Sequence, residues 1–128
     1  MQRAGGSITF DALTADTVTF PSGDDGMPIS LFGYGDKTPD AIHTMVGVTG
    51  TTPSGVVGCW GRHRATGLWG PCGENGGLLN FGEPITQTAH FTIRDIAAMD
   101  RLAFTLASLA GTDTPTFTPV CTALFNES

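Results

Sequence analysis

Residues 84–125 read PITQTAHFTIRDIAAMDRLAFTLASLAGTDTPTFTPVCTALF, and this stretch indicates the architecture of the chain. Over residues 85–93 apolar side chains alternate with polar ones, which is the period of a strand with one buried face. The alternation returns over residues 101–106. A turn sequence at 111–115, with a glycine and a proline, then precedes a threonine-rich run at 116–125. We therefore predict three consecutive antiparallel strands.

A helix over residues 93–109 is the alternative interpretation of the middle of this stretch. An aspartate of the type that caps helix N-termini lies near its start. Its apolar residues also fall near helical spacing, at Ile93, Ile96, Met99, Leu102, Leu106 and Leu109.

The composition favours strands and a single domain. The chain has 128 residues, enough for one hydrophobic core, and it is rich in Gly, Thr and Phe rather than in helix formers. We predict an all-β fold, an antiparallel β-sandwich of Ig-like or jelly-roll-like type with at most one short helix. Residues 1–6 are small and polar and are predicted to form a flexible N-terminal arm, with residues 7–128 forming the single sandwich domain.

The first half of the chain also contains short alternating runs. Residues 8–10 and 17–20 are predicted to pair as a hairpin, residues 28–32 to form a third strand, and residues 41–48 a fourth. Taken with the later strands, these patterns predict a set of inward-facing side chains: Phe10, Phe20, Ile42, Val46, Phe91, Ile93, Leu102, Phe104 and Leu106.

Residues 99–120, MDRLAFTLASLAGTDTPTFTPV, resemble the C-terminal strand pair of small β-sandwich structural proteins of tailed bacteriophages. In those proteins an Asp-Arg-Leu turn opens a strand and a Gly-Thr loop ending in proline leads into the last one. The resemblance implies a virion component made in the host cytoplasm, of the head decoration type. Its partners would be the major capsid protein or other virion subunits, with further copies of itself in a homo-oligomer. No catalytic residue is implied.

Charge and hydropathy argue against two classes of partner. The formal net charge is −6 with a single lysine, which disfavours binding to nucleic acid through phosphate contacts. No apolar run approaches the roughly 20 residues that a bilayer span needs, and the first residues lack the apolar core of a secretory signal, so we expect no membrane partner. Only 14% of residues are charged, and a surface with so few charges favours association with other subunits.

Three cysteines and nearby histidines are the candidates for a metal or nucleophilic site. Cys59, His63 and Cys72 are zinc-type ligands, and His90 or Cys121 could supply a fourth, but their spacing matches no established zinc motif. Buried free thiols, or a disulfide between Cys59 and Cys72, are the alternatives. The odd number of cysteines leaves one unpaired within the chain, which favours a reducing compartment.

Motifs of enzymes are missing from the sequence. A Cys/His nucleophilic pair would need one of the cysteines in a recognisable elbow or at a helix start, and neither Cys59 nor Cys72 has that context. Asp24 and Asp25 lie in a turn sequence, where carboxylates commonly bond the backbone, and no phosphate-binding or dinucleotide glycine motif occurs. We therefore predict a non-enzymatic protein without a cofactor or a metal.

Residues 58–70 carry the candidate interface. This glycine-rich segment is predicted to form a hairpin that brings Trp60 and Trp69 onto neighbouring strands and projects from the domain, with Arg62 and Arg64 between them. Tryptophan and arginine are enriched at binding hot spots. The alternatives are tryptophans that pin the core or a loop, and a carbohydrate platform. The leading functional hypothesis is a capsid decoration protein, and the second is a small carbohydrate- or ligand-binding module.

Overall fold

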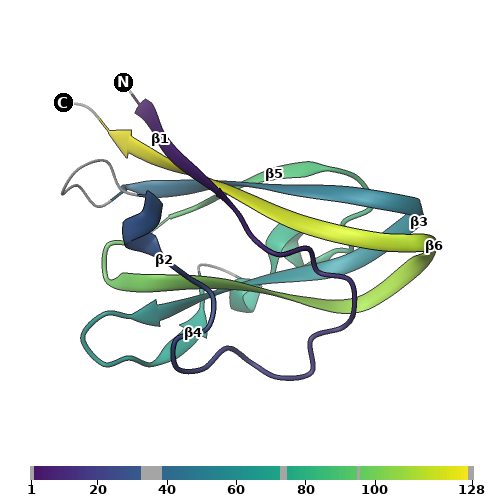
Figure 1. The fold of residues 1–128 in the computed structure, drawn as a ribbon, viewed down its shortest axis with the longest axis horizontal. Coiled ribbons are helices and arrows are strands. Elements are labelled where there is room, and N and C mark those ends of the chain that lie inside the picture. Colours follow the sequence, from purple (N-terminus) through teal and green to yellow (C-terminus); the bar gives the residue numbers. More distant parts are fainter. Residues whose placement is uncertain (1, 33–38, 73–74, 95, 127–128) are drawn as a thin grey trace.

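The computed structural model describes residues 2–32, 39–72, 75–94 and 96–126, and these form one antiparallel sheet of six strands (Figure 1). Within those residues the only helical segments are short 3-10 turns, which confirms the predicted all-β antiparallel class. The strands are β1 (Gln2–Thr9), β2 (Met27–Pro28), β3 (Ala41–His63), β4 (Trp69–Pro71), β5 (Ala89–Ile93) and β6 (Met99–Asn126). The turns are η1 (Ile29–Phe32), η2 (Asn75–Gly77) and η3 (Leu79–Gly82).

The two long strands, β3 and β6, pair along their whole length and bend together. The register shifts several times between Thr49 and Val56, and in Figure 1 both strands run to one end of the molecule and return. One half of the sheet holds β1, the end of β6, the start of β3 and β5; the other holds β2, the start of β6, the end of β3 and β4. The sheet is therefore continuous and curls like half of a barrel, so that its two halves enclose the core.

Glycines at the bend allow this curvature. Gly50 on β3 and Gly111 on β6 have φ of 110° and 121°, a conformation that side-chain-bearing residues rarely adopt. A Cβ at Gly50 would also lie 2.8 Å from the Cα of Pro115. The two strands can approach closely here because both positions lack a side chain.

Residues 84–125 form fewer separate strands than predicted, because two of the three expected strands are one continuous strand. The alternating runs at 101–106 and 116–125 are two arms of the single strand β6, and the turn sequence at 111–115 is its bend. Both arms find their partner in β3, which bends at the same place, so the chain has no need to leave the sheet between them. The alternative interpretation, a helix over residues 93–109, is wrong, because the residues of this range from Met99 onward belong to β6.

Three N-terminal predictions also need correction. Residues 2–6 of the predicted flexible arm belong to β1, which pairs with the C-terminal arm of β6. Residues 17–20 form no strand, because residues 10–26 cross from β1 to β2 as a loop whose backbone bonds go to β6. Residues 28–32 form the end of β2 and the turn η1 rather than a strand.

The core lies between the two facing halves of the sheet. Seven of the nine predicted inward residues are buried, Phe91 is half-buried, and Phe20 is 74% exposed. Phe20 was predicted inward from its place in an alternating run, but that run is loop here and the ring turns outward. No helix in the described part of the chain is long and apolar enough to span a membrane. The largest fully buried side chains include Ile42, Val46, Val57, Ile96, Leu102, Leu106 and Phe117.

Candidate functional site

The end of β3 and β4 form the predicted hairpin. Arg62 lies opposite Trp69, and Trp60 lies opposite Pro71, so the two tryptophans are on neighbouring strands as predicted. The turn is closed by a hydrogen bond from the backbone N–H of Gly67 to the carbonyl of His63, 2.8 Å long. β4 extends the edge of the sheet, so the base of this hairpin is part of the fold rather than a projection from it.

Arg62 is the centre of a charged network beneath the hairpin. Its Nε and Nη2 donate to the two carboxylate oxygens of Asp100 at 2.9 and 2.8 Å. Its Nη1 donates to Asp24 Oδ1 at 2.8 Å and to the carbonyl of Gly23 at 2.9 Å. The hydrogen bonds from Arg62 hold the pKa of Asp100 below its usual value. A single guanidinium thus ties together β3, β6 and the loop of residues 21–26.

The same loop is held by further side chains. Trp69 Nε1 donates to the carbonyl of Gly23 at 3.1 Å, and Arg101 donates to the carbonyls of Asp24 and Asp25 at 2.8 and 2.9 Å. These bonds fix the backbone of the loop at Gly23, Asp24 and Asp25.

The remaining candidates differ in their surroundings. Trp60 is half-buried, and its Nε1 donates to Thr105 Oγ1 at 3.0 Å. Arg64 is exposed near the hairpin turn, and its Nη2 reaches the carbonyl of Met99 at 3.3 Å. The structure therefore makes Arg62 and Trp69 supports of the 21–26 loop, places Trp60 against Thr105 and Phe20, and leaves Arg64 at the surface. Whether any of them contacts a partner stays a prediction.

An exposed apolar surface lies beside this network. The ring of Phe20 rests on Trp60 with centroids 5.0 Å apart and is 74% exposed, and Val18 on the same loop is 92% exposed. We call Val18, Phe20 and Trp60 the aromatic patch. Sequence reasoning missed Val18 and placed Phe20 in the core, because a buried strand and an exposed loop can share the same short alternation.

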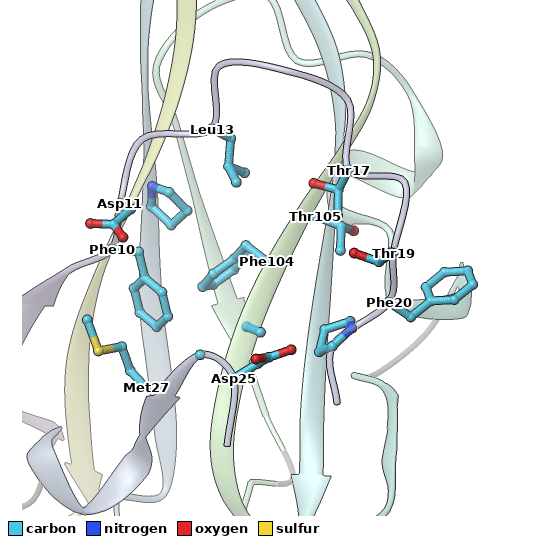
Figure 2. A pocket seen from close by; sticks show the side chains of 14 residues that line it. Phe10, Asp11, Leu13, Thr17, Thr19, Phe20, Asp25, Met27, Phe104 and Thr105 are labelled. Atoms are coloured by element: carbon cyan, nitrogen blue, oxygen red, sulfur yellow. The ribbon is translucent and has the colours of Figure 1, made fainter. Parts of the chain in front are cut away.

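A cavity of about 330 Å³ opens under the 10–26 loop (Figure 2). Its apolar wall is built on Phe10 and Phe104, whose rings meet edge to face with centroids 5.0 Å apart. Thr17, Thr19 and Thr105 are also in its lining. Phe20 lines the cavity as well and so connects it with the aromatic patch. Such a cavity suits one apolar side chain of a partner, or a small amphipathic molecule.

The three cysteines are free and buried, and the candidate zinc ligands Cys59, His63 and Cys72 are not brought together. The exposed ring of His63 bonds Thr66 through Nδ1. Over the residues that the structure describes, no three His, Cys, Asp or Glu side chains are placed to hold a metal ion. Burial raises the pKa of Cys121 to about 11, whereas a hydrogen bond from Cys59 lowers the pKa of Cys72. Burial also raises the pKa of Cys59 well above its usual value.

Asp24 and Asp25 lie in a tight turn, as predicted. The carboxylate of Asp25 accepts the backbone N–H of Ser22 at 2.9 Å, and that of Asp24 accepts from Arg62. The two carboxylates are therefore used to fix the loop backbone and the hairpin.

Comparison of the chain with protein-family models, with curated proteins and with solved structures finds no match in any of the three.

Proposed function

We propose that this protein is a non-enzymatic structural component of a bacteriophage virion, of the capsid decoration type, that attaches to the major capsid protein or another virion subunit through the aromatic patch. The observation that carries the proposal is the exposure of Phe20 and Val18, at 74% and 92%, on a loop held by side-chain hydrogen bonds. The apolar surface of an exposed phenylalanine is removed from water, which is favourable, when a partner covers the ring.

The support beneath the loop favours binding. The loop is anchored on both sides of Phe20: the backbone N–H of Thr17 donates to the carbonyl of Leu106 at 2.8 Å. On the other side, Arg62, Trp69 and Arg101 bond the backbone of residues 23–25. Little conformational freedom of the loop is therefore lost when a partner docks on Phe20. Trp60 backs the ring, and aromatic side chains of this kind are enriched at binding hot spots. The neighbouring cavity offers a place for a side chain of the partner.

The virion assignment rests on the resemblance of residues 99–120 to phage β-sandwich proteins. A capsid presents many identical sites, so a modest contact at each becomes strong attachment when the decoration subunits also contact one another. A surface with few charges suits such repeated contacts.

The first test asks whether the protein is a virion component. Purified particles of the source phage, analysed by quantitative mass spectrometry, are expected to contain it in many copies. Its absence from the particles would overturn the virion assignment.

The second test concerns the surface. Phe20→Ala is expected to lower occupancy on particles at least tenfold while leaving the circular dichroism spectrum unchanged. Phe81→Ala, at another exposed phenylalanine on η3, is the matched control and should bind as the parent does. Equal occupancy of the parent and Phe20→Ala would remove the aromatic patch from the interface.

The cavity of Figure 2 supports a second candidate, a small carbohydrate- or ligand-binding module. Its combination of phenylalanine rings and threonine hydroxyls is a chemistry that a sugar or a small amphipathic molecule can use. A glycan array that gives one reproducible class of ligand, lost on Thr19→Val at the cavity lining, would favour this function over attachment to a capsid.

A further inference from the structure

Two cysteines and a methionine lie near one another where β3, β4 and β6 come together, with Cys72 between Cys59 and Met99. Cys59 lies on β3, Cys72 directly follows β4, and Met99 begins β6. The backbone N–H of Cys72 donates to the carbonyl of Cys59 at 3.0 Å, which places the two cysteines opposite each other in the hairpin. The Sγ of Cys72 lies 3.8 Å from the Sδ of Met99. We call these three residues the sulfur cluster.

Gly61 makes room for the sulfur cluster. A Cβ at this buried position would overlap the Sδ of Met99 and would lie 3.1 Å from the Sγ of Cys72. Gly70, which lies opposite Gly61 in the hairpin, is a contrast, because a Cβ at Gly70 would meet nothing within 4 Å. The sulfur atoms of Met99 and Cys72 therefore occupy the space over Gly61 that a side chain would otherwise fill.

The donor set and its spacing suit a soft monovalent cation. Thiolate and thioether ligands favour soft metals, copper(I) among them. With metal–sulfur bonds of about 2.3 Å, three sulfurs placed trigonally around one ion lie roughly 4 Å apart, and the 3.8 Å between Cys72 and Met99 fits this. A structural zinc site usually has four ligands, and over the residues that the structure describes no third His, Cys, Asp or Glu side chain is placed beside the two cysteines to hold a metal ion.

Two surface cavities give access to the sulfur cluster. Cys59 and Cys72 are in the lining of one cavity of about 400 Å³, together with Phe81 and Phe91. Met99 lines another of about 420 Å³ on the hairpin side. An ion can thus reach the buried sulfurs without unfolding of the sheet.

We propose that Cys59, Cys72 and Met99 form a binding site for one soft monovalent cation of the copper(I) class. On binding, the two thiols release their protons to solvent, and two thiolate sulfurs and one thioether sulfur coordinate the ion. The oxidation state of the metal and of the sulfurs does not change. The site is independent of the aromatic patch.

The test uses the full chain, reduced and kept free of oxygen, and titrates it with copper(I) against a competing copper(I) chelator. We expect one ion per chain, and X-ray absorption is expected to show three sulfur neighbours. Met99→Leu, which conserves the volume of the side chain, and Cys72→Ser should each lower the affinity at least tenfold. Cys121→Ser removes the third thiol of the chain, which lies on the C-terminal arm of β6 beside Thr44 of β3. This variant should bind copper(I) as the parent does.

Gly61→Ala keeps all three sulfurs but forces Met99 to move, so it should also weaken binding. Because loss of a buried thiol can destabilise the fold, Met99→Leu and Gly61→Ala decide the question if Cys72→Ser does not fold. Unchanged affinity in Met99→Leu, or loss of the ion in Cys121→Ser, would show binding by thiols in general and overturn the proposal. Absence of bound copper(I) in the reduced parent protein would also overturn the proposal.

Discussion

Phe104→Ala tests whether the loop of residues 10–26 really closes the core. The ring of Phe104 is 8% exposed and packs edge to face against Phe10, and both rings line the cavity of Figure 2. Deleting a buried phenylalanine side chain costs about 3–5 kcal/mol, and the aromatic pair accounts for roughly 0.5–1.5 kcal/mol of such a loss. We expect a cost of about 3 kcal/mol, at the lower end of that range, because the neighbouring loop can relax into the space. At roughly 4 °C per kcal/mol for a domain of this size, Tm should fall by about 12 °C.

The matched control is Phe20→Ala, which removes the same side chain from the other side of the loop. Phe20 is 74% exposed, so the variant should stay within about 0.5 kcal/mol of the parent. Urea unfolding followed by tryptophan fluorescence measures both, with an unchanged m-value as the sign that only stability has altered. Equal destabilisation by the two variants would refute the arrangement of this loop, because it would mean that both rings are core.

Three further predictions concern single positions. Gly50→Ala should lower the free energy of unfolding by more than about 1 kcal/mol, because φ is 110° and the new Cβ would meet the facing backbone. Gly47→Ala, with ordinary φ and no close contact, should cost less, and thermal unfolding compares the two variants. Arg62 holds the folded pKa of Asp100 below its unfolded value, so the pair stabilises the fold above the unfolded pKa, and this stability is lost as pH falls through the folded pKa. Asp100→Asn should therefore lose less stability than the parent on acidification below about pH 4, and an equal loss in urea titrations would contradict this. The Cys121 thiol, buried and with its pKa raised to about 11, should resist alkylation at pH 8 until the protein unfolds; labelling of the native protein at this residue, seen by peptide mass spectrometry, would show that it is exposed.

The sequence by itself was sufficient for the class of fold and for part of the core. Strict alternation around Ile42, Ile93 and Leu102 predicted buried strand faces, and each of these side chains is buried. The hairpin that carries Trp60 and Trp69 was also predictable, because a glycine-rich turn between two short runs is a local signal. The choice of these residues as an interface came from residue type alone and stays a prediction.

Only the tertiary structure decided which segments those strands and side chains meet. Alternation extends over a few residues, so it cannot tell that β6 continues through its bend beside β3, or that residues 17–20 cross the sheet as an exposed loop. Arg62 finds Asp24 and Asp100, each 38 residues away, and Cys72 meets Met99 across 27 residues. Contacts of this kind depend on the pairing of distant strands, which is set by the free energy of the whole sheet and leaves no local pattern in the sequence.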